Sequence, residues 1–180
     1  MQKRQTQTKT IIKDSLASLL LEEKFEDISV SKLTRKSGIN RGTFYLHYID
    51  KYDMMDQLKA ETLAQLTQIL EDTNLNPKAT IKAALDYLKN DFTFIFAISK
   101  SSFTDFSQTI TIFLKNMIEN SPMVVSDLAN SYHIPEKYAL EMLVASIESI
   151  ITLWIADGAI ESTEEMTEII FNVSYFDKWR

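Results

Sequence analysis

The chain has 180 residues, of which 45% are hydrophobic and 11% aromatic, enough apolar material for one or two small domains with a core. It has no cysteine, which excludes disulfide bonds and thiolate metal sites. The first residues lack the apolar stretch of a signal peptide. The most apolar run, residues 142–156, is short for a membrane span and contains Glu148. We therefore expect a cytoplasmic protein with no membrane partner.

The formal net charge of −6 is unevenly distributed along the chain. Residues 1–51 carry ten Lys and Arg against six Asp and Glu, a surplus of four positive charges, which leaves −10 for the rest. A basic head on an acidic body indicates that only the head approaches a polyanion. The alternative is a chance scatter of surface charge.

Apolar residues recur at spacings of three and four along most of the chain, a period that predicts amphipathic helices. The three prolines and the third glycine fall between these stretches, at expected helix boundaries. We therefore expect an all-α fold of about nine helices. The first is expected over about residues 8–24, with one apolar stripe.

Two short helices and a longer one are expected next. Ser29 is a good N-cap for the first short helix, and Gly38 ends it as a C-terminal glycine with positive φ. Asn40 caps the second short helix, which runs to about Tyr48. Asp50 then caps the longer helix.

Two or three further helices are expected over residues 78–120. The stretch FTFIFAI alternates like a strand, but we predict a helix because nothing else in the chain can pair with a strand. The helix expected over residues 135–157 is apolar nearly all round, so more than one side of it must be covered. A last helix begins at Ser162, with Glu165 completing a capping box.

A short helix, a turn at glycine and a second short helix form the pattern of a helix-turn-helix, whose second helix enters the major groove of DNA. Gly42 lies early in that second helix, where a missing side chain lets the backbone approach DNA closely. Arg41 can bind a guanine edge or a phosphate. Lys51 and the amides at the start of the following helix can hold another phosphate. A compact helical knot with solvated cations is the alternative.

The predicted DNA-binding residues come from both short helices and the start of the next. They are Ser29, Ser31, Asn40, Arg41, Gly42, Thr43, Tyr45, Leu46, His47 and Lys51.

The segment FEDISVSKLTRKSGINRGTFYLHYIDKYDMMDQL resembles the N-terminal domain of the TetR/AcrR family of transcriptional regulators. The resemblance rests on the run Gly-Ile-x-Arg-Gly-Thr-Phe-Tyr-x-His-Tyr that begins at Gly38, with Ser29 before it and Lys51 after it. Thr34 and Ser37 depart from the family's usual alanines, although both remain small. The resemblance implies a DNA-binding domain over residues 1–51 and a ligand-binding and dimerisation domain over 52–180.

The stretch SIESIITLWIADGAIESTEEMTEII is similar to the last two helices of many family members, which build a dimer as a four-helix bundle. The all-round apolar helix predicts the same arrangement on physical grounds. A homodimer would read two half-sites of a pseudo-palindromic operator. The predicted interface residues are Met142, Ile147, Ile151, Trp154, Ile155, Met166, Ile170 and Val173.

Family members usually bind a small molecule in the C-terminal domain and release DNA, so the resemblance implies a repressor of this kind. The aromatic residues of the body would line such a pocket and favour an apolar or cationic ligand over an anionic one; as an alternative, they are core. They are Phe92, Phe96, Phe103, Phe106, Phe113 and Trp154.

No motif indicates an enzyme, a cofactor or a metal site. The two histidines, His47 and His133, are too few and too far apart for a metal cluster, and no glycine-rich phosphate loop is present. Two alternatives stay open beside the ligand-released repressor. One is a TetR-like co-activator or interaction module controlled by a partner protein; the other is a helical carrier of apolar molecules with an incidental basic head.

Overall fold

The computed structural model describes residues 2–72, 76–119 and 122–174. Within these ranges it contains ten α-helices and one short 3₁₀ helix, and no strand. The contacts divide the chain into two compact units. The first unit comprises Met1–Gln65 and Asp91–Asp105; the second comprises Leu66–Asn90 and Phe106–Arg180.

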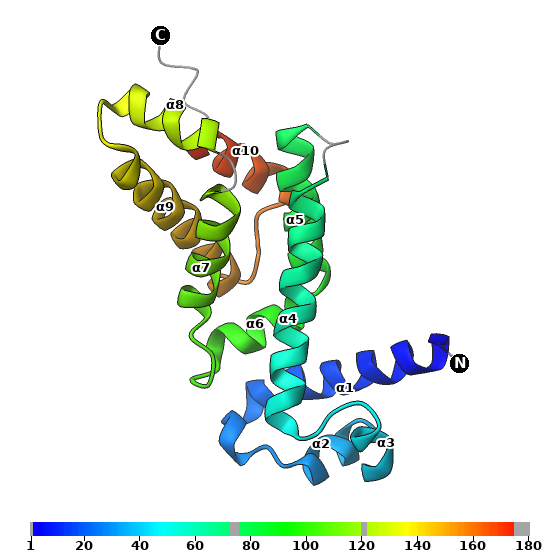
Figure 1. Ribbon diagram of the computed structural model, residues 1–180. Coiled ribbons are helices and arrows are strands. Elements are labelled where there is room, and N and C mark those ends of the chain that lie inside the picture. Colours follow the sequence, from blue (N-terminus) through cyan, green and yellow to red (C-terminus); the bar gives the residue numbers. More distant parts are fainter. Residues whose placement is uncertain (1, 73–75, 120–121, 175–180) are drawn as a thin grey trace. The chain divides into compact units, whose positions relative to one another are not determined.

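The first unit holds α1 (Gln2–Glu22), η1 (Phe25–Asp27), α2 (Val30–Lys36), α3 (Arg41–Tyr45), most of α4 (Lys51–Leu70) and α6 (Phe92–Lys100). α1 packs on α2, and α2 packs on α3, at the blue end of the colour scale (Figure 1). The stripe predicted for the first helix is buried, as are the apolar residues of the short helices. The largest fully buried side chains of this unit are Ile12, Leu16, Phe25, Ile28, Leu33, Phe44, Met54, Met55, Phe94 and Ile95.

α6 belongs with the N-terminal helices. It packs against α1 more extensively than any other two helices pack together. Lys13 of α1 forms an ion pair with Asp91 and lies 4.5 Å from the ring centre of Phe94. The predicted boundary after residue 51 therefore differs from the division in the structure: α4 continues through that point, and the apolar face of α6 covers α1. The ambiguous stretch FTFIFAI is helical, as predicted.

The second unit holds α5 (Pro77–Asn90), α7 (Phe106–Glu119), α8 (Pro122–Tyr132), α9 (Glu136–Ala156) and α10 (Thr163–Ser174). α7 and α8 pack against α9, while α10 packs mainly on α5. The sequence did not predict α8 as a separate helix. Its eleven residues begin at a proline, where a helix can start, but they offer only a short apolar pattern.

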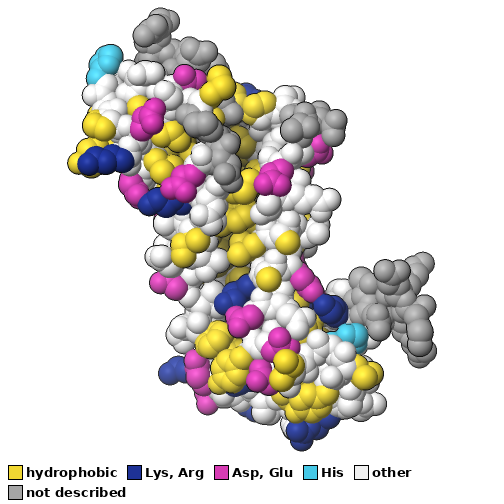
Figure 2. Space-filling view, in the orientation of Figure 1, with side chains coloured by type: hydrophobic (Ala, Val, Ile, Leu, Met, Phe, Trp, Pro, Cys, Tyr) yellow, Lys and Arg dark blue, Asp and Glu magenta, His cyan; other side chains and the backbone are white. Residues whose placement is uncertain are grey.

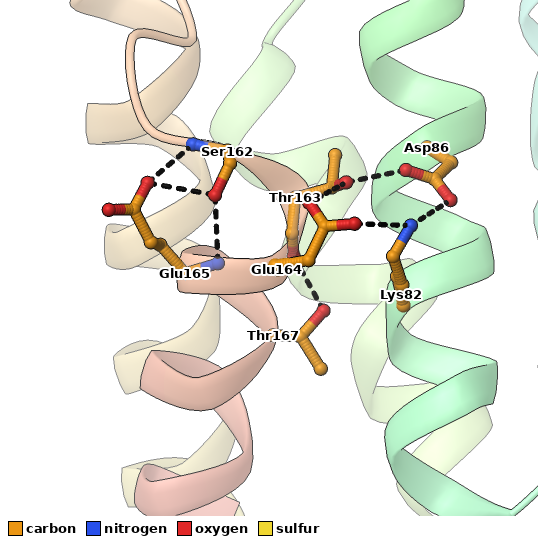
Figure 3. A network of polar contacts seen from close by, with 7 residues as sticks. All are labelled: Lys82, Asp86, Ser162, Thr163, Glu164, Glu165 and Thr167. Carbon is orange, nitrogen blue, oxygen red and sulfur yellow. Dashed lines mark hydrogen bonds and ion pairs between the residues drawn. The ribbon is translucent and has the colours of Figure 1, made fainter.

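The capping box predicted at the start of α10 is present (Figure 3). The amide of Ser162 donates to Glu165 Oε2 at 2.8 Å, and the amide of Glu165 donates to Ser162 Oγ at 3.2 Å. Thr163, the first residue of α10, donates its hydroxyl to Asp86 of α5 at 2.5 Å. Lys82 lies between Asp86 at 2.8 Å and Glu164 at 3.0 Å. Polar contacts thus join the helix start to α5.

Candidate nucleic-acid interface

The turn between α2 and α3 is built by local caps. Ser29 has an extended conformation and accepts a hydrogen bond from the amide of Lys32 at 3.1 Å. Gly38 has φ +66°, which confirms the predicted left-handed glycine. The amide of Ile39 donates to the carbonyl of Thr34 at 3.1 Å and closes the end of α2. These contacts give a helix-turn-helix geometry, in agreement with the sequence pattern.

Asn40 holds the first turn of α3 together. Its Oδ1 accepts from the amide of Thr43 at 2.8 Å and from the hydroxyl of Thr43 at 3.1 Å. A Cβ on Gly42 would lie only 3.2 Å from the same oxygen. Gly42 is exposed, as close approach to DNA would require, and the crowding at Asn40 gives a second reason for glycine here. The side chains of Asn40 and Thr43 are thus committed to the cap.

Arg41 and Tyr45 lie one turn apart on the exposed side of α3. Arg41 Nη2 donates to the Tyr45 hydroxyl at 3.3 Å, and the guanidinium carbon lies 5.9 Å from the ring centre. The side chain of Tyr45 is 48% exposed and that of Leu46 is 82% exposed, whereas His47 is half-buried beside Tyr48. Hydrophobic and basic side chains lie next to each other on the surface of this unit (Figure 2). α3 therefore presents a cation, a phenol and an apolar group together.

The start of α4 differs from the expectation that its amides hold a phosphate. Asp50 Oδ1 accepts from the amides of Tyr52 at 2.8 Å and Asp53 at 2.9 Å. Asp53 in turn accepts from the amide of Ile49 at 2.8 Å, and this hydrogen bond is the main cause of the lowered pKa of the Asp53 carboxyl. Carboxylates of the chain itself therefore accept from these three amides, and a phosphate contact at the start of α4 stays a prediction.

Lys51 is also bound within its own unit. Its Nζ donates to the carbonyls of Phe25 and Glu26, both at 2.8 Å. These carbonyls belong to η1, far away in the sequence, so the contact had no signal in the local pattern. An ammonium group has three donors, and two of them are used here. One N–H of Lys51 is left for a further acceptor.

A large exposed apolar residue of this region was absent from the prediction. Ile49, in the turn after α3, is 80% exposed. Its apolar type suggested burial, and only the path of the turn reveals that its side chain faces solvent.

The six aromatic residues predicted to line a pocket are divided between the two units. Phe92, Phe96 and Phe103 belong to the first unit, and Phe106, Phe113 and Trp154 to the second. Phe92 stacks on Phe96 at 5.4 Å. Trp154 is buried, and its indole N–H donates to the carbonyl of Glu161 at 3.3 Å. Trp154 therefore serves the core of its unit, the alternative that the sequence had left open.

Most of the predicted interface residues are buried inside a single chain. This holds for Ile147, Trp154, Ile155, Met166 and Ile170, whereas Met142, Ile151 and Val173 are half-buried. The prediction assigned the most apolar positions to the interface, but the unit's own core uses them. The apolar side chains exposed on α9 and α10 are instead Tyr138, Leu153 at 62% and Ile169 at 42%.

α9 combines buried, half-buried and exposed apolar side chains. By length and composition alone, α9 is long and apolar enough to cross a membrane, but the core helix of a soluble protein can meet the same criteria. In its most apolar window, 33% of the residues are buried. Within the described ranges, no group of three or more His, Asp or Glu is placed to hold a metal ion.

Comparison with known proteins identifies the family. A family model described as "Transcriptional regulator C-terminal region", TetR_C_8, matches residues 75–175. The "Fatty acid metabolism regulator protein" of Bacillus subtilis (strain 168) is 23% identical over 157 residues, which cover 79% of this chain and 80% of that protein.

Solved structures share the fold. FadR from Bacillus subtilis in complex with stearoyl-CoA has a TM-score of 0.62 at 18% identity and covers 92% of this chain and 97% of its own. The dihydroxyacetone kinase operon activator DhaS has a TM-score of 0.63 at 18% identity, with 92% and 93% covered. These relatives are regulators and not enzymes. The chain belongs to the TetR family of transcriptional regulators.

Proposed function

We propose that the protein is a sequence-specific DNA-binding repressor in which α3 enters the major groove. The observation that carries this proposal is the exposed pair of Arg41 and Tyr45 on a helix that its own caps and Gly38 hold in a helix-turn-helix. In that geometry the first residues of the second helix meet base edges.

Each exposed side chain has a role that its chemistry suits. The guanidinium of Arg41 can leave the Tyr45 hydroxyl and bind the O6 and N7 atoms of a guanine. Tyr45, Ser31 and His47 can donate to phosphates at the groove wall. Leu46, almost fully exposed, can contact a thymine methyl group. Asn40 and Thr43 shape the helix start.

The DNA-binding form is proposed to be a homodimer joined through α9 and α10. A second copy of the chain is the occupant that we infer for the exposed apolar face with Tyr138, Leu153 and Ile169. Of the most apolar window of α9, 33% is buried within its own chain, and Leu153 is 62% exposed. A two-fold dimer would match a pseudo-palindromic operator with half-sites one helical turn, or a multiple of it, apart.

The proposed ligand is a long-chain fatty acyl-CoA. Support comes from the relative that regulates fatty acid metabolism and from the fold shared with a stearoyl-CoA complex. The acyl chain agrees with the apolar ligand expected from the sequence. The phosphates of coenzyme A do not, because the sequence analysis favoured an apolar or cationic ligand over an anionic one. If the ligand weakens DNA binding, DNA weakens ligand binding by the same factor.

Titration of a preformed protein–DNA complex tests the ligand. Stearoyl-CoA is added while the anisotropy of a labelled operator duplex is followed, with coenzyme A and stearate added separately as controls. Release by stearoyl-CoA, and by neither component at the same concentration, is expected. An unchanged anisotropy in the presence of stearoyl-CoA would contradict the ligand assignment and leave DNA binding intact.

A second candidate is a co-activator that responds to a protein. The fold shared with DhaS, an operon activator, supports the activating part of this candidate. It predicts that acyl-CoA leaves the DNA complex unchanged, while a purified partner protein alters operator occupancy.

A further inference from the structure

Three aromatic rings meet beside Lys51 in the first unit. The rings of Phe25 and Phe103 lie 4.3 Å apart between centres. Tyr52 lies 5.5 Å from Phe25, edge to face, and 5.7 Å from Phe103. Each ring therefore touches the other two, at distances typical of favourable aromatic pairs. We name Phe25, Tyr52 and Phe103 the Lys51 socket.

The Lys51 socket fixes the ammonium group in one place. Nζ lies 4.9 Å from the ring centre of Phe25 and 5.2 Å from that of Tyr52. The same atom donates to the carbonyls of Phe25 and Glu26. A lysine that moves freely loses rotamer entropy when it binds a phosphate. The two carbonyls and the two rings restrain Lys51 Nζ, and one N–H of its ammonium group is left for a further acceptor.

Phe103 reaches the Lys51 socket from a distant part of the chain. It lies in the segment between α6 and α7, where Ser101 Oγ accepts from its amide at 3.3 Å. Phe25 is 1% exposed and Phe103 half-buried, so the ring of Phe103 covers Phe25. Without that cover, the η1 turn that carries both carbonyls loses its outer packing.

We propose that Phe103 is a positioning residue for DNA binding. It holds Phe25, and with it the two carbonyls that direct the remaining N–H of Lys51 towards a backbone phosphate. This inference rests on the proposed DNA-binding function and replaces the expectation that Phe103 lines a ligand pocket. The contact of Lys51 with DNA thereby depends on residues 101–105, directly before α7.

A double-mutant cycle on the full-length protein tests this role. Binding of a labelled duplex is measured over a salt series for Lys51→Met, Phe103→Leu and the double variant. Lys51→Met is expected to reduce the slope of log affinity against log salt by about one unit, since one phosphate contact is lost. Phe103→Leu is expected to reduce the slope in the same direction. The double variant should match Lys51→Met within about twofold, because the two changes act through one contact.

Two further variants separate positioning from folding. Tyr52→Leu opens the Lys51 socket from a more exposed side and should reproduce the effect of Phe103→Leu if the latter folds poorly. Phe113→Leu changes a half-buried phenylalanine of α7 and should leave the salt slope unchanged.

Additive losses in the double variant, or an unchanged slope in Phe103→Leu and Tyr52→Leu, would overturn the proposal. An unchanged slope in Lys51→Met would do so too, and Arg41→Ala would then still weaken binding if the proposed function holds. If the wild-type protein binds no duplex, both the proposed function and this inference fail.

Discussion

At Arg41 the free protein keeps its guanidinium against the Tyr45 hydroxyl, 3.3 Å away and exposed to solvent. Little must be broken for it to turn towards DNA, because both groups are hydrated. The pair also limits the rotamers of a long side chain. Under the proposed function, we therefore expect Arg41 to provide base preference.

Arg41→Ala is expected to lower the preference for one base pair of each half-site by about 1–3 kcal/mol. The preference is measured with operator duplexes that differ at single positions. Lys137→Ala, which removes an exposed cation of α9, serves as the charge-matched control and should leave the preference intact. Equal affinity losses on every duplex would assign Arg41 to a phosphate.

Tyr48 carries a buried hydroxyl that lacks a hydrogen-bond partner among the described residues, and its side chain is 2% exposed. Since an unsatisfied polar group is costly to bury, Tyr48→Phe is expected to stabilise the protein by about 1 kcal/mol. Denaturant unfolding measures this change, with Tyr52→Phe as the control at an exposed tyrosine. A loss of stability in Tyr48→Phe would contradict this prediction, because it would show that the hydroxyl forms a stabilising hydrogen bond.

The same hydroxyl predicts a pH dependence. Burial first, and then the charges of Glu61 and Asp53, raise the pKa of Tyr48 from 10.0 to about 12. Between these two values the unfolded chain releases the proton and the folded chain keeps it, so stability falls as pH rises. Part of the alkaline loss should be absent from Tyr48→Phe. Identical alkaline profiles for the two proteins would refute the assignment.

Among the elements, α5 and α10 are joined by the polar network around Lys82 (Figure 3). Hydrogen bonds from Lys82 are the main reason why the pKa values of Asp86 and Glu164 are lowered. A lowered pKa adds stability above the ordinary values of these carboxyls, 3.8 and 4.5. That contribution is lost as pH falls through the folded-state values.

Lys82→Met is therefore expected to lower the urea midpoint of unfolding at neutral pH. The difference from the wild-type midpoint should shrink as the pH falls below the pKa values of these carboxyls. Midpoints are compared across this range, with Lys137→Met as the control for loss of a lysine. A deficit that stays constant at acid pH would show that packing of the Lys82 stem, and not its charge, joins the helices.

Local chemistry explains which elements the sequence could predict. The helix caps join residues only three positions apart, so the spacing in the sequence predicts them. This holds for Ser29, Asn40 and the Ser162–Glu165 capping box. Lys51 differs because its acceptors lie in η1, far away in the sequence. The attachment of α6 to α1 is a tertiary contact, which periodicity does not encode.

For the whole molecule, the proposed dimer needs apolar groups that the chain leaves exposed. The sequence assigned the most apolar residues of α9 and α10, such as Ile155, to the interface, and Ile155 is buried within its own unit. Those residues are in the core because a helix of this size must first fill its own unit. Leu153 and Ile169 remain exposed.

Leu153→Glu and Ile169→Glu are each expected to give folded monomers, since a buried unpaired charge opposes association. Light scattering gives the mass, and circular dichroism reports the folding. Ile112→Glu, at an exposed isoleucine of α7, should remain dimeric. Dimers in both interface variants would place the interface elsewhere.

The central claim is sequence-specific DNA binding, and one measurement tests it most directly. Fluorescence anisotropy of the full-length protein is followed on DNA from immediately upstream of its own gene and on scrambled DNA of the same composition, across a salt series. Tight binding to the upstream DNA alone, lost in Arg41→Ala, is the predicted result. Equal affinity for both duplexes at every salt concentration, unchanged in Arg41→Ala, would contradict it.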